Sequence, residues 1–179
     1  MLNDISKIMF DEKQLDDMVK TLADRINSDY QGNQIILVGL LKGSVVFLSD
    51  LMRKITVPCT IDFMIASSYG ASTVSSGNVK ISRDLSSSIE GKNVIIVEDI
   101  VDSGNTLSCL LELLKCRKPE SLKLCSLLSK PSRREKEVNI DYLGTEIPDE
   151  FVVGYGLDYN ELYRNLPYLC VLKPEVYSV

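Results

Sequence analysis

The hydrophobic positions of this chain fall into two kinds of pattern that alternate along it. Residues 34–40 (QIILVGL) form a short β-branched run containing a glycine, which predicts a buried strand. After this strand, apolar residues follow helical spacing from Val45 onward. Before that strand, residues 11–30 carry apolar side chains at helical spacing: Leu15, Met18, Val19, Leu22, Ala23 and Ile26. The first part of the chain therefore predicts a helix, a buried strand and a second helix.

The same alternation continues beyond residue 56. Apolar runs at 57–66, 94–97 and 122–129 predict three further strands, and residues 142–159 predict one more at the end. A helix before the third of these runs carries four leucines on one side: Leu107, Leu110, Leu111 and Leu114. Strands rich in Val, Ile and Leu that alternate with helices are typical of a mostly parallel, twisted sheet covered on both faces. We therefore expect an α/β fold.

One stretch departs from this pattern. Residues 67–78 (SSYGASTVSSGN) are dominated by Ser, Gly and Thr, which cannot bury a core, so we expect a mobile loop there. Residues 79–85 (VKISRDL) are expected to return as a strand. The length of 179 residues suits one domain, and no internal repeat or domain boundary is visible.

Composition narrows the possible partners. With 45% hydrophobic and 25% charged residues the chain has the profile of a soluble globular protein, and a net charge of -5 argues against unspecific binding to nucleic acid. The N-terminal residues lack the pattern of a signal peptide, and no stretch is apolar enough to cross a bilayer. Five widely spaced cysteines, without C-x-x-C and without any histidine, favour reduced thiols over a zinc site. We therefore expect a cytoplasmic protein that binds neither nucleic acid nor membrane.

Residues suited to chemistry follow the predicted strands repeatedly. Lys42-Gly43 follow the first buried strand, residues 98–106 follow the run at 94–97, Lys130 follows the run at 122–129, and Asp158 follows FVVGYGL. Ligands of parallel sheets bind beyond the carboxyl ends of the strands. We therefore expect these four groups on one rim of the sheet.

Residues 98–106 (EDIVDSGNT) combine three acids with small polar residues. They match neither the nucleoside-triphosphate P-loop nor the dinucleotide motif. Small polar residues 103–106 before a helix can still hold a phosphate through backbone N–H groups and hydroxyls. Glu98 and Asp99 would repel that phosphate unless they bind another part of the same ligand, for which the hydroxyls of a sugar are the obvious candidate. Asp102 is then left for proton chemistry.

The stretch VIIVEDIVDSGNTL (94–107) closely resembles the phosphoribosyl-pyrophosphate (PRPP) signature of the type I phosphoribosyltransferases. Four further stretches, LVGLLKGSVVFLSDL, SSYG, CSLLSKPSRR and FVVGYGLDYNELYRNLPY, are similar to the hypoxanthine-guanine branch of that family. The resemblance implies a type I phosphoribosyltransferase fold in a single domain, 1–179. Its core would span about 11–150, a flexible lid loop about 67–80, and a small hood would combine N-terminal residues with about 151–179.

For the ribose and its phosphate, the resemblance implies that Glu98 and Asp99 hold the ribose hydroxyls of PRPP. Asp102 would lie near N7 of the purine as general base. The 5′-phosphate would be held by residues 102–106: Asp102, Ser103, Gly104, Asn105 and Thr106. Asn105 stands at a position that varies in the family, and these residues would also serve as a helix N-cap.

For pyrophosphate and metal, the resemblance implies that Lys42 and Gly43 form a loop with a cis peptide before the lysine. Arg164 would be the second pyrophosphate contact. Asp158 would be a Mg²⁺ ligand, together with Glu98 and Asp99. The simpler alternatives are an ordinary surface lysine at position 42 and a surface ion pair between Arg164 and Glu161.

For the base, Lys130 is the informative residue, because an ammonium only donates hydrogen bonds and so suits a 6-oxopurine rather than adenine. The resemblance implies that Phe151 stacks on the purine and that Val152 offers backbone groups to its edge, near Asp158. Ser68 and Tyr69 would belong to the lid and exclude water from the reaction. Without the resemblance, Lys130 would be read as a loop lysine and Phe151 as a core aromatic.

Together these expectations describe a purine-salvage enzyme. It would transfer the 5-phosphoribosyl group from PRPP to N9 of hypoxanthine or guanine with Mg²⁺, giving IMP or GMP and pyrophosphate, as a homo-oligomer (dimer or tetramer). Xanthine phosphoribosyltransferase and a non-catalytic PRPP sensor remain alternatives. A phosphoacceptor receiver domain is disfavoured, because its acid pair follows the first strand.

Overall fold

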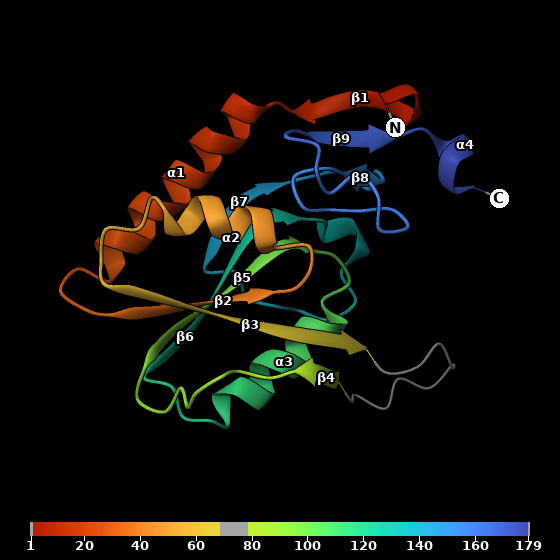
Figure 1. Cartoon of the computed structure of the whole chain (residues 1–179). Coiled ribbons are helices and arrows are strands. Elements are labelled where there is room, and N and C mark those ends of the chain that lie inside the picture. The colour runs from red at the N-terminus through yellow and green to blue at the C-terminus, as the bar shows by residue number, and fades with distance from the viewer. Residues whose placement is uncertain (1, 69–78, 179) are drawn as a thin grey trace.

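The computed structural model describes residues 2–68 and 79–178, which form two sheets and their covering helices (Figure 1). The strands are β1 (Ile5–Phe10), β2 (Ile35–Leu40), β3 (Cys59–Ser68), β4 (Val79–Arg83), β5 (Asn93–Val101), β6 (Ser121–Ser129), β7 (Tyr142–Glu146), β8 (Val152–Val153) and β9 (Leu169–Leu172). The helices are α1 (Glu12–Asp29), α2 (Val45–Met52), α3 (Asn105–Lys115) and α4 (Pro174–Tyr177), with 3-10 turns η1 (Leu2–Asp4) and η2 (Pro131–Arg133).

The main sheet has the strand order β4-β3-β2-β5-β6-β7. The strands from β3 to β7 in this order are parallel, and β4 joins β3 antiparallel at the edge. Side chains alternate between the faces: Ile35 and Leu37 of β2 pack with α1 and α2, whereas Ile36 and Val38 pack with α3. Helices on both faces of a mostly parallel sheet confirm the predicted α/β fold.

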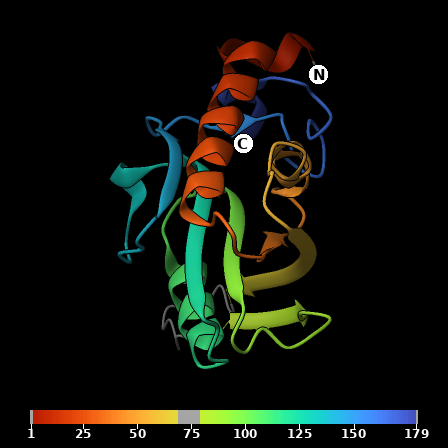
Figure 2. The same ribbon diagram turned by 90° about the vertical axis from the view of Figure 1, so that its left-hand side faces the viewer.

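The helix predicted over residues 11–30 is α1, and its start is fixed by a capping box. Gln14 N donates to Asp11 Oδ1 (2.8 Å), and Asp11 N donates to Gln14 Oε1 (2.9 Å). The buried side chains of α1 agree with the predicted apolar face: Leu15, Val19, Leu22, Ala23 and Ile26. In the side view, α1 runs from the small sheet down along the main sheet (Figure 2).

Two strand predictions need correction. β5 continues through Glu98 and Asp99 to Val101, because it keeps pairing with β6 as far as Ser129, so the acids lie within the end of the strand rather than after it. The single strand predicted over 142–159 is two strands in different sheets, β7 and β8. Pro148, which has no N–H to donate to a ladder, lies between them.

The second sheet is small and has the order β1-β9-β8. β9 pairs antiparallel with β1 and with β8, so residues from the two ends of the chain lie side by side above the main sheet (Figure 1). Of the residues predicted in the lid, Ser68 is the last residue of β3, and Tyr69 lies outside the described residues. Among the described helices, none combines the length and the apolar character needed to cross a bilayer.

Candidate active site

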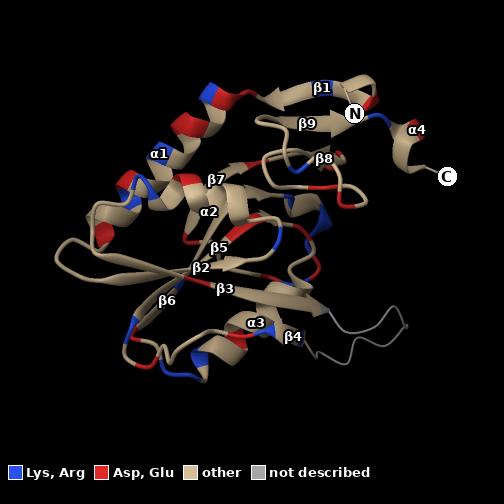
Figure 3. Ribbon diagram, viewed as in Figure 1, with Lys and Arg blue, Asp and Glu red and all other residues tan. Residues whose placement is uncertain are grey.

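The loops after β2, β5 and β6 lie at the carboxyl ends of parallel strands and face the loop that follows β8 (Figure 1). Acidic and basic residues adjoin along these loops (Figure 3). All four groups of residues predicted to share one rim of the sheet belong to these loops or to the strand ends beside them.

Two glycines allow the β2–α2 loop to lie against the other loops. A Cβ on Gly43 would lie 1.8 Å from Asp99 Oδ2, and a Cβ on Gly156 would lie 2.2 Å from the Gly43 carbonyl oxygen. Gly156 also has φ +102, where a side chain would be strained. The peptide between Leu41 and Lys42 is cis, as the resemblance implied.

The residues predicted to bind pyrophosphate are joined to acids of the loop after β8. Lys42 Nζ lies 2.8 Å from Glu161 Oε2, and Arg164 Nη2 lies 3.6 Å from the same oxygen. Arg164 Nη2 also lies 2.8 Å from Asp158 Oδ1, while its Nη1 donates to the Gly156 carbonyl at 2.8 Å. Two cations from distant parts of the chain therefore converge on one carboxylate oxygen.

The adjacent acids of β5 are both partly enclosed. Burial, with the neighbouring Asp99 charge as a second cause, raises the pKa of Glu98 well above its usual range. Burial raises the pKa of Asp99 to about 6, although a hydrogen bond from Ile100 N and the charge of Arg164 oppose the shift. Hydroxyl donors or a cation bound beside these two carboxyls would favour their ionised form.

The loop predicted to hold the 5′-phosphate connects β5 to α3. Gly104 has φ +81, and a Cβ there would lie 2.4 Å from the Lys136 carbonyl oxygen. The Ser103 carbonyl accepts hydrogen bonds from Glu135 N (2.9 Å) and Lys136 N (3.0 Å). The N-cap residue of α3, Gly104, provides no side-chain cap, and apart from a long bond from Asn105 N to Ser103 Oγ (3.4 Å) the first backbone N–H groups of the helix are left for an anion.

Asn105, predicted with its neighbours to hold the 5′-phosphate at a position that varies in the family, has a structural contact. Its Nδ2 donates to Glu135 Oε2 at 2.6 Å. Together with the bonds to Ser103, this contact ties the loop to the segment after η2.

Lys130 follows β6 and is buried, with its side chain 10% exposed. Its Nζ lies 3.8 Å from Asp149 Oδ1, which is beyond hydrogen-bond distance. A buried ammonium with unused donors suits a carbonyl acceptor on a ligand.

Val152 is the first residue of β8 in the small sheet, and Phe151 lies just before it. The Phe151 ring is stacked on Tyr177 (4.7 Å between centroids) and lies edge-on to Tyr159 (5.5 Å). The Phe151 carbonyl accepts from Leu172 N (2.9 Å), so by antiparallel alternation the N–H and C=O of Val152 point away from β9, toward the open edge of the sheet. That edge is where a ligand could pair with backbone groups.

Sequence reasoning missed one residue of the site. Arg133 Nε lies 3.0 Å from Asp102 Oδ1, and its Nη1 lies 3.5 Å from Asp149 Oδ1. Its spacing of three residues from Lys130 was an available signal, because side chains at i and i+3 share a side of a 3-10 turn.

The donor set for a metal consists of Glu98, Asp99 and Asp158, whose oxygens are the ligands that Mg²⁺ prefers. In residues 2–68 and 79–178, no three acids or cysteines converge closely enough to hold a metal by themselves. The set fits Mg²⁺ held by one or two carboxylates together with a ligand's phosphate oxygens.

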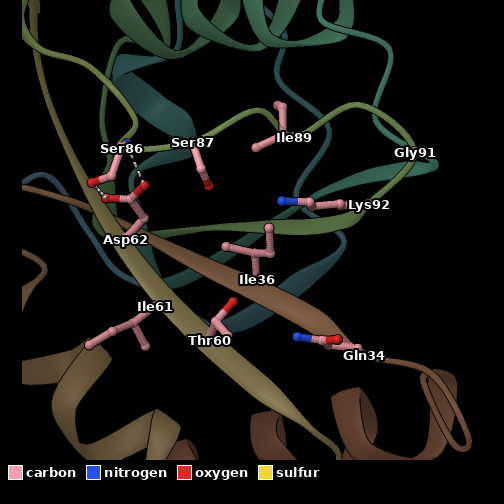
Figure 4. A pocket seen from close by; sticks show the side chains of 10 residues that line it. All are labelled: Gln34, Ile36, Thr60, Ile61, Asp62, Ser86, Ser87, Ile89, Gly91 and Lys92. Atoms are coloured by element: carbon pink, nitrogen blue, oxygen red, sulfur yellow. Dashed lines mark hydrogen bonds between the residues drawn. The ribbon is translucent and has the colours of Figure 1, made fainter.

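A separate hollow of about 440 Å³ lies at the amino ends of β2, β3 and β5 (Figure 4). Its acid, Asp62, already accepts hydrogen bonds from Ser86 N (2.7 Å), Ser86 Oγ (3.0 Å) and Phe63 N (2.8 Å). None of the predicted site residues lines this hollow, so the chemistry gathers at the other end of the strands.

Comparisons with known proteins agree on one family. The model of the phosphoribosyl transferase domain matches residues 8–160. A hypoxanthine-guanine phosphoribosyltransferase of Staphylococcus aureus is 51% identical over 99% of both chains. A bifunctional protein TilS/HprT of Listeria monocytogenes is 50% identical over 99% of this chain, which spans 28% of that relative's length. The crystal structure of a hypoxanthine phosphoribosyltransferase from Staphylococcus aureus superposes with a TM-score of 0.96 at 51% identity, covering 100% of this chain and 97% of the other.

Proposed function

The chain belongs to the phosphoribosyltransferase family, and on that premise we propose that it is a purine-salvage hypoxanthine-guanine phosphoribosyltransferase. It transfers the 5-phosphoribosyl group of PRPP to N9 of hypoxanthine or guanine and releases pyrophosphate with IMP or GMP. The identity of 51% with a hypoxanthine-guanine phosphoribosyltransferase over nearly the whole length supports this choice.

In this proposal each part of PRPP has its own residues. Backbone N–H groups and hydroxyls of residues 103–106 bind the 5′-phosphate, and Glu98 and Asp99 accept hydrogen bonds from the ribose hydroxyls. Lys42 and Arg164 bind the pyrophosphate, for which Lys42 must leave Glu161. The proposal is supported by the position of all these groups at the carboxyl ends of parallel strands.

The base lies between Phe151 and the main sheet, with its 6-oxo group accepting from Lys130 and its edge against Val152. N9 attacks C1′ as the bond from C1′ to the pyrophosphate oxygen breaks, with inversion. Asp102 accepts the proton that leaves N7. Lid residues Ser68 and Tyr69 remain predicted to exclude water at this stage.

Mg²⁺ belongs to the proposal as the cofactor, with Asp158 and the Glu98–Asp99 pair as the residues that would hold it. When bound, it neutralises the charge on the pyrophosphate.

The observation that carries the choice of base is the burial of Lys130 with its nearest acid at 3.8 Å. An ammonium at the end of a mostly buried side chain has few acceptors to choose from, so a base that offers an acceptor at this point is favoured over one that offers a second donor. Hypoxanthine and guanine carry that acceptor at position 6, and adenine carries an amino group there.

The test is a PRPP- and Mg²⁺-dependent conversion assay with hypoxanthine, guanine, xanthine and adenine in parallel. Turnover of the first two, with adenine inert, is the expected result. Xanthine as the best substrate would keep the reaction and change the specificity. Binding of PRPP without turnover of any base would contradict the enzymatic proposal and favour a PRPP sensor.

We further propose a homo-oligomer in the cytoplasm. Three large apolar side chains, Val45 and Met52 of α2 and Ile61 of β3, are exposed on the same side of the main sheet. Exposed apolar side chains on one side of the sheet favour a contact with another copy. The five cysteines are free thiols, which is typical of a reducing compartment. Sedimentation of a double variant, Val45→Asp with Ile61→Asp, tests the homo-oligomer, because these substitutions should yield monomers.

A further inference from the structure

Arg133 lies where three segments of the site meet. It belongs to η2, directly after Lys130, and its guanidinium reaches Asp102 in the β5–α3 loop and Asp149 in the β7–β8 connection. The distances are 3.0 Å from Nε to Asp102 Oδ1 and 3.5 Å from Nη1 to Asp149 Oδ1. Asp149 Oδ1 is also the oxygen nearest to Lys130 Nζ, at 3.8 Å.

These contacts form a chain of alternating charges, Lys130, Asp149, Arg133 and Asp102. Its two ends are the residue that reads the 6-oxo group and the residue that accepts the N7 proton in the proposed function. Positions 6 and 7 of a purine are both bonded to C5 and lie on the same edge of the base, so the spacing between these two ends must match the base closely.

The contact between Arg133 and Asp102 leaves the carboxylate ready for a ligand. Asp102 Oδ1 is buried, and although Arg133 Nε is close, their alignment is not that of a hydrogen bond, so this oxygen accepts none from the described residues. Oδ1 faces Arg133 and is shielded from solvent, whereas the Asp102 side chain as a whole is 44% exposed, so the exposed side of the carboxylate remains open to the proton on a ring nitrogen.

We propose that Arg133 is a positioning residue, which holds the Asp102 carboxylate at the N7 edge of the base and couples it through Asp149 to Lys130. The inference rests on the proposed function. Arg133 does not touch the substrate and acts only through Asp102. Because its side chain is 53% exposed, its ion pairs add little to stability, so its removal should affect turnover far more than unfolding.

The test is a double-mutant cycle of Arg133→Ala and Asp102→Asn, with kcat and KM measured for hypoxanthine and PRPP. Arg133→Ala should lower kcat about tenfold, because a misplaced catalytic group is costly, and leave the KM for PRPP within about twofold. In the Asp102→Asn background, the same substitution should change kcat by less than about twofold, since residues that act as one unit are not additive. Arg133→Lys, which keeps the charge, should recover part of the loss.

The matched control is Arg117→Ala. Arg117 forms a bidentate ion pair with Asp84 (2.7 and 2.8 Å) that involves no site residue, so its removal should leave kcat unchanged.

Three outcomes would overturn the inference. Arg133→Ala could behave like Arg117→Ala, which would deny Arg133 a part in turnover. Equal losses with and without Asp102 would assign it a role independent of that acid. A wild-type protein that converts no purine would remove the proposed function and the inference with it, whereas the first two outcomes leave the proposed function intact.

Discussion

Two groups of charges lie in the loops of the site, and they are built differently. The phosphate-side cluster (Lys42, Asp158, Glu161 and Arg164) has an exposed lysine, 63% exposed at the side chain, held 2.8 Å from Glu161. The base-side cluster (Asp102, Lys130, Arg133 and Asp149) has a lysine that is only 10% exposed, with its acid 3.8 Å away.

The difference matches the two kinds of ligand that the proposed function requires. A polyanion can displace an exposed carboxylate, since surface ion pairs contribute only about 0–1 kcal/mol. A neutral carbonyl cannot compete with a carboxylate for a tightly paired ammonium. The lysine that donates to the carbonyl must therefore be shielded from water and only loosely paired. Selectivity is therefore expected from the base-side cluster and exchange of ligand from the phosphate-side cluster.

The largest effect is expected from Asp102→Asn. An amide cannot accept the N7 proton, so kcat should fall at least tenfold and typically by about 10²–10⁴-fold, with the fold intact. Steady-state kinetics and circular dichroism check this. A variant of near-normal rate would remove Asp102 from the mechanism.

The next effect separates the clusters directly. Lys130→Met removes the donor for the 6-oxo group and should lower kcat/KM for hypoxanthine by about 10–100-fold, with little change in the KM for PRPP. Lys42→Met is the mirror variant and should raise the KM for PRPP instead. If both variants impaired the use of hypoxanthine and of PRPP equally, the division between the clusters would be wrong.

A smaller effect concerns stability. The pKa of Asp99 is raised by burial to about 6 in the folded protein and lies near 3.9 in an unfolded chain, so between these values the unfolded state ionises first. The free protein is therefore less stable at pH 7.5 than the protonated form would be. Asp99→Asn should raise the Tm at pH 7.5 by about 6–12 °C, and this gain should vanish as the pH falls through 6 toward 4.

Scanning calorimetry across that range, beside an activity assay, checks the prediction. Turnover of the variant should fall, because the ribose hydroxyls lose an anionic acceptor. A Tm gain that persists at pH 4 would show that ionisation of Asp99 is not its cause.

The smallest effect is expected from Glu161→Gln. Without its negative charge, the side chain competes less for Lys42, and the KM for PRPP should fall by about twofold, the range of an exposed ion pair. The KM for hypoxanthine should not change. A rise in the KM for PRPP would mean that Glu161 assists binding rather than opposing it.

The sequence predicted the elements whose signal is local. The apolar face of α1 is visible because it repeats at helical spacing, and β2, β5 and β6 are visible as short, continuous apolar runs. The division of residues 142–159 between two sheets was not visible, since β8 is a strand only by pairing with β9, about twenty residues later. A two-residue strand has no periodicity to detect.

The site shows the same limit. Glu98, Asp99 and Lys130 could be predicted because each belongs to a recognisable motif at the end of a strand. The spacing of Arg133 from Lys130 could have marked it as a site residue, but its role could not be read from the sequence, because its partners Asp102 and Asp149 come from two other loops. Only folding shows that these loops meet.

The pairing of β1 with β9 also has a consequence for the order in which the protein is made. Of the nine described strands, β1 leaves the ribosome first and β9 last, so β1 waits for its neighbour until residue 172 has been synthesised. The main sheet, with the acids of β5 and the loop before α3, can assemble earlier, because all of its strands end by residue 146. Phe151 and Val152 lie on the sheet that closes last, so a growing chain would acquire its sites for the ribose and the 5′-phosphate before it acquires a wall for the base or the later residues Asp158 and Arg164.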